Sequence, residues 1–367
     1  MKFVLFSDLH LDARFAWTGG QSGAGHRRRR ALRDTLLRII DLAIEERVDA
    51  VLCGGDLYEH DRYSPDTLEF LRAAFERLNP IRCFIAPGNH DWYGPPSIYH
   101  RAKWSPNVHI FRDRRLEPVE LTNGLTLWGA AHTAPAGTPG FLDNFRVDRG
   151  GVHLALFHGS ERVGIAGEGT DKEPHAPFDA NQIKGSGLSH ALLGHYHNAK
   201  EEEWFTYPGN PDPLSFGESG DRGAVVVTVE NDGRITRTRV PVAVSQVHDL
   251  NVEVTGATNA QEIRARVASS ISALRGAARV SLHGDIAPEV SLRIDDIESL
   301  PSALDSLVVR TDGLHTAYDV DVIAEEATIR GRFVRQVRDS PLTPAEQERV
   351  LTTGLRAFDG RDDLEVV

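Results

Sequence analysis

The chain has 367 residues, of which 40% are apolar and 26% are charged, and its formal net charge is −12. This length predicts two domains, and this composition is typical of a soluble globular protein with a sizeable core. The acidic balance argues against a protein that coats nucleic acid non-specifically, although bound cations could supply positive charge at an enzyme site.

The compartment is predicted from the apolar runs and the cysteines. No apolar run approaches the roughly 20 residues that a bilayer-spanning helix requires, and the opening MKFVLFSDLH does not have the pattern of a signal peptide. Cys53 and Cys83 each stand in an apolar run and are expected to be reduced core thiols. We therefore expect a cytoplasmic protein with no membrane partner.

Short apolar runs followed by polar residues recur from the amino terminus to about residue 241. Runs of this length, when bounded by Gly, Pro or Asn, predict strands that are buried on both faces. Five of these runs directly precede polar motifs, and they occupy residues 2–6, 50–54, 81–86, 152–157 and 190–194.

Helices are predicted between the first strands. Apolar residues repeat at the helical period after the first strand, at Leu32, Leu36, Ile39, Ile40 and Ala43. A second helix is expected to follow Pro65, so that strand and helix alternate up to about Pro96 in the α/β pattern. The chain then becomes richer in strands and reaches a hairpin over residues 223–240, around an Asn-Asp-Gly turn.

A compact α+β unit is predicted after Pro241. Its strands are expected over residues 248–255, 278–284, 289–295 and 307–311, and its helices over residues 259–274 and from Ser299 onward. A last helix carries Leu351, Leu355 and Phe358 on one stripe. The predicted domains are therefore residues 1–243, residues 247–340 and a helical tail over residues 341–367.

Polar motifs stand at the ends of the five strands. They are Asp8-Leu-His10, Gly55-Asp56, Gly88-Asn89-His90-Asp91, His158-Gly159 and Gly194-His195-Tyr-His197. In an α/β sheet the carboxyl ends of strands share one edge, where sites assemble. Residues i and i+2 of a strand point to the same side, so both members of the D-x-H and H-x-H pairs are expected to face one metal cluster.

The donor set indicates divalent ions. Carboxylate oxygen mixed with imidazole nitrogen suits Mn²⁺, Fe²⁺ or Zn²⁺. Asp56 is a single carboxylate between two groups of ligands and could bridge two ions roughly 4 Å apart, which together activate a hydroxide for in-line attack on phosphorus. Each motif by itself is more often a surface or core feature, but five in this order, each closing an apolar run, favour a metal site.

The order of the motifs resembles that of the calcineurin-like metallophosphoesterases, and among them the SbcD and YhaO type of bacterial DNA repair nuclease. The supporting segments are residues 45–61, 156–160, 192–197, 206–223 and 329–339. The GDLYEHDRY and GNHDWYG segments depart from the Ser/Thr phosphatase branch, which carries GDxVDRG and GNHE. The resemblance implies a two-sheet sandwich flanked by helices, with a small α+β capping domain that guides DNA.

The resemblance also implies roles for the motif residues. One ion would be bound by Asp8, His10, Asp56 and His197, and the other by Asp56, Asn89, His158 and His195. His90 would protonate the leaving sugar oxygen as general acid, held in place by a neighbouring carboxylate such as Asp91. Mn²⁺ is the first expectation for the two ions, with Fe²⁺ or Zn²⁺ as alternatives.

The activity expected from the resemblance is that of a two-metal DNA exonuclease, with DNA and an SbcC-type coiled-coil ATPase as partners. The tail helix could dock onto that ATPase or pack on its own domain, and a homodimer is a further expectation. A phosphodiesterase for a small substrate, such as a cyclic nucleotide, and a non-catalytic metal-binding scaffold of a repair complex remain as alternatives.

Four consecutive arginines, Arg27, Arg28, Arg29 and Arg30, are expected in the loop between the first strand and the first helix. Cations at a helix amino terminus oppose its dipole, so helix stability gives no reason for them. They are interpreted either as a solvated loop or as contacts to DNA phosphates beside the site.

Other aromatic residues carry weaker signals. His132 ends a strand and could reach the site. Trp92 and Tyr93 could stack on a splayed base or pack in the core. The histidines without ligand spacing are expected at the surface or behind the ligands: His26, His60, His100, His109, His175 and His190.

Overall fold

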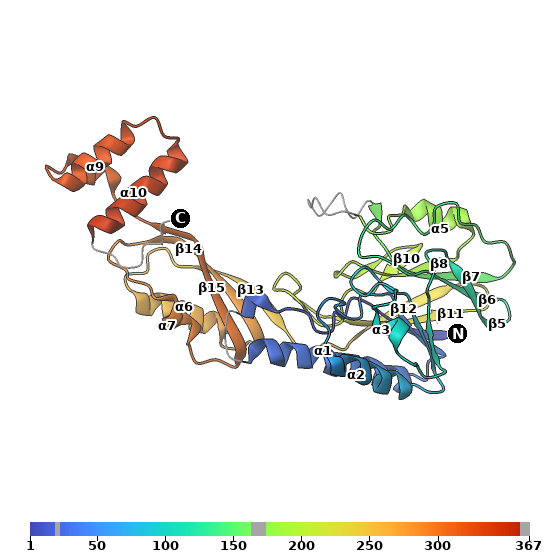
Figure 1. Cartoon of the computed structure of the whole chain (residues 1–367). Coiled ribbons are helices and arrows are strands. Elements are labelled where there is room, and N and C mark those ends of the chain that lie inside the picture. Colours follow the sequence, from blue (N-terminus) through green and yellow to red (C-terminus); the bar gives the residue numbers. More distant parts are fainter. Residues whose placement is uncertain (19–22, 163–173, 360–367) are drawn as a thin grey trace. The chain divides into compact units, whose positions relative to one another are not determined.

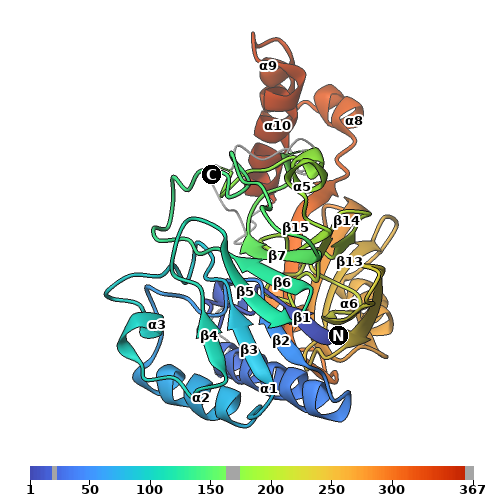
Figure 2. The same ribbon diagram turned by 90° about the vertical axis from the view of Figure 1, so that its right-hand side faces the viewer.

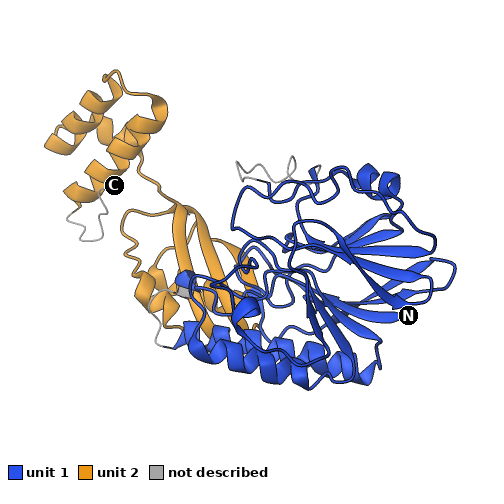
Figure 3. Ribbon diagram, turned by 45° about the vertical axis from the view of Figure 1, so that its right-hand side comes forward, with its two compact units in different colours: residues 1–247 blue, residues 248–367 orange. Residues whose placement is uncertain are grey.

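The computed structural model describes residues 1–18, 23–162 and 174–359. The chain divides into two compact units, residues 1–247 and residues 248–367 (Figure 3). The predicted tail falls within the second unit, and its residues 360–367 lie outside the described part of the chain.

The first sheet of unit 1 is built from the predicted apolar runs at the start of the chain. Its strand order is β12-β11-β1-β2-β3-β4, and Figure 1 labels the two strands β11 and β12 at one edge. The parallel strands are β1 (Lys2–Phe6), β2 (Ala50–Cys53), β3 (Arg82–Ile85) and β4 (Val108–Ile110). The antiparallel strands β11 (Gly223–Val229) and β12 (Ile235–Pro241) form the predicted hairpin, which is confirmed.

The second sheet has the order β5-β6-β7-β8-β10-β9. Its parallel strands are β6 (Leu125–Gly129), β7 (Val152–His158), β8 (His190–Gly194) and β10 (Phe205–Tyr207). The antiparallel edges are β5 (Glu117–Thr122) and β9 (Lys200–Glu201). All five apolar runs that precede polar motifs are strands, as predicted.

The two sheets stack on each other between layers of helix (Figure 2). Phe3, Leu52 and Phe84 of the first sheet pack against Leu127 and Leu156 of the second in one buried cluster. The outer face of the first sheet is covered by α1 (Ala24–Glu45) and α2 (Pro65–Glu76), and α5 (Ala180–Ser186) packs on the second. Shorter helices are η1 (Ala16–Thr18) and α3 (Ile98–Arg101). The expected α/β two-sheet sandwich is confirmed.

Unit 2 contains a three-stranded sheet and two groups of helices. The sheet order is β13 (Val247–Glu253), β14 (Gly276–Ile286) and β15 (Leu304–Thr316), with α6 (Ala260–Ile271) and α7 (Ile294–Glu298) packed in the same apolar cluster. The amphipathic helix predicted over residues 259–274 is present, and the side chain of Asn259 caps it.

Two predictions for unit 2 were wrong. Residues 289–295 form a loop and the start of α7 instead of a strand, and Ser299 ends that helix rather than beginning one. Val290 and Leu292 alternate as in a strand, but Asp295 and Asp296 favour the first turn of a helix, whose dipole attracts negative charge. The alternation therefore reflects apolar side chains of a loop packed on the core.

The predicted tail helix is α10 (Pro344–Phe358). Thr343 and Glu346 close its amino end in a capping box. Leu351 and Leu355 pack with residues of α8 (Val320–Glu325) and α9 (Ile329–Arg338), so this stripe lies on its own unit. Among the described residues, no helix is long and apolar enough to cross a membrane.

Candidate metal centre

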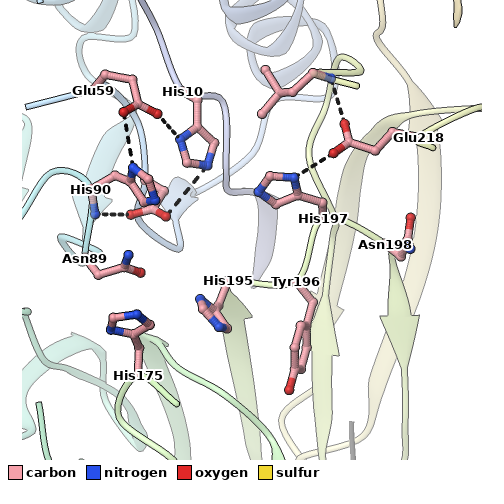
Figure 4. A pocket seen from close by; sticks show the side chains of 12 residues that line it. His10, Glu59, Asn89, His90, His175, His195, Tyr196, His197, Asn198 and Glu218 are labelled. Atoms are coloured by element: carbon pink, nitrogen blue, oxygen red, sulfur yellow. Dashed lines mark hydrogen bonds and ion pairs between the residues drawn. The ribbon is translucent and has the colours of Figure 1, made fainter. Parts of the chain in front are cut away.

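The polar motifs meet at one cavity of about 570 Å³ in unit 1 (Figure 4). Its walls include predicted site residues, namely His10, Asp56, Asn89, His90, His195 and His197. Asp8 and His158 lie directly behind them, because both are completely buried and within 4.8 Å of Asp56. The cavity wall also contains Glu59, His175, Asn198 and Glu218, which were not predicted as site residues.

The side chains reach the cavity by a different route from the one predicted. The ligand pairs lie beyond the strand ends, and the backbone of Asp8, His10, Asp56 and His195 is left-handed, with φ of 55°, 49°, 51° and 119°. Alternation along a strand therefore does not orient them. A left-handed conformation costs about 1 kcal/mol or more of folding free energy for each non-glycine residue. It is kept only where contacts with the surrounding structure stabilise it. Left-handed backbone therefore occurs at four of the predicted site residues, whereas His158 is the last residue of β7.

Asp56 lies between the two predicted sets of ligands. One of its oxygens, Oδ2, is 3.7 Å from Nε2 of His10 and 3.2 Å from Nε2 of His158. Nε2 of His158 is in turn 3.3 Å from Nδ1 of His195. Three groups among the described residues could hold an ion, namely Asp8 with His10 and His197, His10 with Asp56 and His90, and Asp8 with Asp56 and His158, so that Asp56 and Asp8 each belong to two of them. This arrangement fits a carboxylate shared by two ions.

Three of the predicted ligand imidazoles are held through Nδ1, which leaves Nε2 as the nitrogen that faces the other site residues. Nδ1 of His10 is 2.7 Å from Glu59, Nδ1 of His197 is 2.8 Å from Glu218, and Nδ1 of His158 is 2.9 Å from the Gly54 carbonyl oxygen. Metal-binding histidines are usually held in this way, because an acceptor on the outer nitrogen fixes the tautomer and the ring orientation.

Two buried atoms give a direct test of whether a metal fits. Nε2 of His10 and Oδ1 of Asn89 are buried and have no hydrogen-bond partner among the described residues. Leaving a buried polar atom unsatisfied costs about 1–3 kcal/mol. Both atoms belong to predicted ligands, and their lone pairs are the donors that Mn²⁺, Fe²⁺ or Zn²⁺ accepts. The residues therefore fit divalent ions.

Burial and neighbouring charges raise the pKa of some imidazoles of the site and lower that of others. Burial opposes the charge on Asp56, but the facing His158 ring outweighs burial and holds the pKa of that carboxyl well below its usual range. Burial likewise opposes the charged form of His158, while Asp56 raises the pKa of His158 to about 9. Burial and the charge on His158 lower the pKa of His195 to about 2.

We expect Mn²⁺ binding to release protons and to weaken as the pH falls from about 8 to 6. The metal-free His158 has a raised pKa of about 9 and is protonated in this range, whereas a ligand imidazole must be neutral. Affinity should therefore rise with pH toward 9. Calorimetry in two buffers of different ionisation enthalpy counts the protons released, and an affinity independent of pH would contradict the assignment of His158 as a ligand.

The carboxylate that holds His90 is Glu59, and the prediction of Asp91 was wrong. Nδ1 of His90 is 3.2 Å from Oε2 of Glu59. Asp91 is completely buried and points away, and it accepts hydrogen bonds from the backbone N–H groups of Asp56, Leu57 and Gly88 and from the hydroxyl of Tyr99. Its carboxylate ties the loop after β2 to the loop after β3.

Asp91→Asn is expected to lower the free energy of unfolding by about 3 kcal/mol, because an amide N–H₂ group would face donors that now share a carboxylate. Urea unfolding of the metal-free protein measures the change. Asp148→Asn is the control, since that carboxylate is 72% exposed and its loss should cost less than about 0.5 kcal/mol. Equal stability of the two variants would contradict the structural role of Asp91.

The hydrogen bond to Glu59 raises the pKa of His90 to about 9, against the opposing effect of burial. Burial favours the neutral form of Glu59, but its hydrogen bonds to His10 and His90 prevail and lower the pKa of Glu59 to about 2. Glu59 is thus a carboxylate and His90 an imidazolium at neutral pH.

Three histidines outside the predicted ligand set take different positions. His132 is completely buried, and its ring nitrogens contact Thr138 and the His158 carbonyl oxygen, so it supports His158 from behind instead of lining the cavity. His175 does line the cavity, with its ring centroid 5.6 Å from that of His195, although its spacing gave no signal. His190 is buried against Thr206 rather than at the surface.

Comparison with known proteins identifies similar chains. The model of the calcineurin-like phosphoesterase family matches residues 1–199. The chain is 28% identical over 299 residues to the uncharacterized metallophosphoesterase YhaO of Bacillus subtilis (strain 168), covering 75% of this chain and 68% of that protein. It is 28% identical over 276 residues to the DNA double-strand break repair protein Mre11 of Methanopyrus kandleri, covering 65% of this chain and 58% of that protein.

A third relative is a subunit of the nuclease SbcCD of Staphylococcus epidermidis, and the two chains are 22% identical over 236 residues. That alignment covers 54% of this chain and 60% of the relative. The chain thus spans between 58% and 68% of the length of these three proteins. The matches agree with the resemblance that the order of the motifs indicated.

Proposed function

The chain belongs to the calcineurin-like phosphoesterase family, and from this premise we propose that it is a two-metal-dependent DNA nuclease that hydrolyses phosphodiester bonds at DNA ends. The observation that carries the proposal is the cavity in which Asp56 lies between two sets of inward-facing ligand atoms. DNA as substrate is supported by the names of two relatives, a DNA double-strand break repair protein and a nuclease subunit.

The proposed ligands are those expected from the sequence. Asp8, His10, Asp56 and His197 would hold one ion, and Asp56, Asn89, His158 and His195 the other. When bound, two such ions generate a nucleophile from water at neutral pH and stabilise negative charge on the transferring phosphoryl group. Mn²⁺ is the ion proposed, because mixed oxygen and nitrogen donors without thiolate suit it.

His90 is proposed as the general acid. Its side chain is 45% exposed at the cavity, so a phosphodiester can reach it. The contact between Nδ1 and Glu59 leaves Nε2 as the nitrogen that can donate a proton to the leaving oxygen.

Fewer arginines of the run are proposed to contact DNA than the sequence predicted. The four residues lie in the first two turns of α1 and not in a loop, so the loop prediction was wrong. Arg28 is buried, 3.4 Å from Asp212, and donates to the Pro213 carbonyl oxygen, which removes it from a surface that contacts DNA. Arg27 and Arg30 are exposed and Arg29 is half-buried, and these three are proposed to contact DNA phosphates.

Replacing Arg27, Arg29 and Arg30 with Ser, while keeping Arg28, is expected to weaken DNA binding about equally for all sequences. The slope of log affinity against log salt is negative, and it should become shallower by about 0.9 for every phosphate that is no longer neutralised. Binding to a labelled duplex across a salt series measures this slope, and hydrolysis of a small diester should be unchanged. An unaltered slope would indicate that the three arginines are solvated on the helix surface and do not contact DNA.

Base stacking is proposed only for Trp92. Tyr93 packs against both apolar clusters of the first sheet, which agrees with the core-packing alternative. The ring of Trp92 is half-buried, and its centroid is 4.8 Å from that of His60. Stacking of a base on such a platform contributes about 1–3 kcal/mol.

The partners are proposals drawn from the relatives. The α+β unit is proposed to cap the site and guide DNA. An SbcC-type coiled-coil ATPase is proposed as partner, since a relative is named as a subunit of SbcCD. The side chain of Phe358 on α10 is 46% exposed and would be available for that contact. A homodimer and a cytoplasmic location complete the proposal.

The test compares substrate classes. The protein is incubated with Mn²⁺ and, separately, labelled linear duplex DNA, a 2′,3′-cyclic nucleotide and a phosphomonoester, and His90→Ala is treated alike. Degradation of DNA that the variant lacks would support the nuclease. Hydrolysis of the cyclic nucleotide alone would favour a small-substrate phosphodiesterase, and bound metal without turnover of any substrate would favour a scaffold.

A further inference from the structure

The cavity wall contains one side-chain amide that the proposed hydrolysis does not use, that of Asn198. This residue directly follows the proposed ligand His197 and is exposed where it lines the cavity. Its Oδ1 accepts a hydrogen bond of 3.0 Å from the guanidinium of Arg222. We propose that Nδ2 of Asn198 binds the DNA phosphate that neighbours the scissile phosphate, an inference that rests on the proposed function.

The guanidinium that holds Asn198 is itself fixed by the protein. Arg222 is only 5% exposed. Its Nε donates to the Glu218 carbonyl oxygen at 2.6 Å, its Nη1 donates to the His197 carbonyl oxygen at 2.6 Å, and it also donates to Oδ1 of Asn210. A planar guanidinium with this many acceptors has little freedom to rotate. The position of Oδ1 of Asn198 is therefore set from behind the cavity wall.

The contact with Arg222 also determines which end of the amide is available to a ligand. A guanidinium has donors and no acceptor, so the amide atom that meets it is the oxygen, and the NH₂ group is the free end. Among the described residues, Nδ2 of Asn198 has no protein acceptor. Holding an exposed side chain in one rotamer costs conformational entropy. The arrangement thus presents two oriented N–H donors at the cavity.

The position of these donors favours a phosphate other than the scissile one. The proposed metal ligands meet at Asp56, whereas Figure 4 shows Asn198 beyond His197, on the side of the cavity away from His90. None of the described residues that line the cavity is an arginine or a lysine. Side-chain amides commonly donate to the phosphate oxygens of DNA. Asn198 is therefore placed to bind a second phosphate of the same strand.

A phosphate-binding amide and a purely structural amide predict different effects of Asn198→Asp. A carboxylate at this position keeps one oxygen toward Arg222 and makes that contact charge-assisted. Its other oxygen replaces the NH₂ group, so that a negatively charged acceptor faces the phosphate instead of a donor. The variant should therefore remain folded and lose the second phosphate. A structural amide would lose nothing.

The experiment adds one phosphate to a dinucleotide without adding a base. Diester cleavage with saturating Mn²⁺ is followed by chromatography on thymidylyl-(3′,5′)-thymidine and on the same dinucleotide phosphorylated at its 5′ or its 3′ end. Asn198→Asp is expected to lower kcat/KM at least about tenfold on one of the two phosphorylated dinucleotides, because a hydrogen bond to a charged group is lost. The change on the unphosphorylated dinucleotide should be less than about threefold.

Asn123→Asp is the matched control. It introduces the same charge at an exposed residue of unit 1 that does not line the cavity. Its kcat/KM should equal that of the wild type on all three dinucleotides. Metal content after dialysis against Mn²⁺ should be the same in Asn198→Asp, Asn123→Asp and the wild type, which separates loss of phosphate binding from loss of an ion at His197.

Two further readouts do not depend on turnover. In a His90→Ala background with Mn²⁺, Asn198→Ala should bind a labelled duplex about tenfold more weakly. The slope of log affinity against log salt should be unchanged, because a neutral amide neutralises no phosphate. Urea unfolding of Asn198→Asp should have a midpoint no lower than that of the wild type, since Arg222 keeps its partner.

Different results overturn different claims. If the wild type hydrolyses the dinucleotides but Asn198→Asp slows all three equally, or slows none, Asn198 does not bind a second phosphate and the proposed function stands. An unchanged duplex affinity of Asn198→Ala, or a lower unfolding midpoint of Asn198→Asp, would overturn the inference as well. If the wild type degrades DNA but no dinucleotide, the duplex affinity decides. If it hydrolyses neither, the proposed function fails and the inference fails with it.

Discussion

Asp56→Asn is expected to abolish the binding of at least one ion and to lower DNA hydrolysis by about 1,000-fold or more, which corresponds to about 4 kcal/mol of lost transition-state stabilisation. Asp56 is 4% exposed and approaches Nε2 of both His10 and His158. An amide carries no charge and offers one oxygen where a carboxylate offers two.

The measurement is metal content after dialysis against Mn²⁺, together with thermal unfolding with and without the ion. An ion at 100 times its dissociation constant stabilises a folded protein by about 2.7 kcal/mol, and the variant should lose most of that gain. Asp41→Asn is the control, because that carboxylate is 51% exposed and pairs only with Arg77 among the described residues. Retention of two ions by Asp56→Asn would contradict the shared-carboxylate site.

His90→Ala is expected to lower kcat for DNA by about 100- to 10,000-fold while both ions remain bound, since general acid catalysis contributes in this range. The side chain of His90 is half exposed at the cavity and its ring is held by Glu59. Its removal opens no buried void, so the fold should be retained. Initial rates on linear duplex DNA and the metal content of the same samples separate the two effects.

The control for His90→Ala is His100→Ala, an exposed histidine that does not line the cavity. One outcome would instead identify His90 as a metal ligand. His90 lies with His10 and Asp56 in a group that could itself hold an ion. If His90→Ala loses an ion in proportion to its loss of activity, His90 is a ligand and another residue supplies the proton.

The strands of the sandwich and the motifs that follow them could be predicted from the sequence. Runs such as residues 2–6 and 190–194 are buried on both faces, so nearly every side chain in them is apolar and the pattern is local. The same reasoning failed at residues 289–295, where apolar side chains of a loop imitate the alternation of a strand. A local pattern of apolar residues therefore predicts which side chains are buried, but it does not always predict the secondary structure of the segment.

The orientation of the site residues could not be predicted. The sequence placed Asp8 and His10 on a strand, whereas both lie in left-handed turns beyond β1. Asp91 is the nearest carboxylate to His90 along the chain, yet it points into the protein and ties two loops together. Glu59, from a different loop, is the carboxylate that meets His90 in space.

The arginine run also separates what the sequence predicts from what the tertiary structure decides. Four identical residues in sequence become a buried structural contact at Arg28 and accessible side chains at Arg27 and Arg30, because a helix turns successive residues by about 100°. The sequence by itself determined the fold class, the five strand ends and the kinds of side chain that meet at the cavity, since each depends on short apolar runs and the residues that close them. Only the tertiary structure decided which carboxylate faces which imidazole, because that depends on loops far apart in the chain meeting at one cavity.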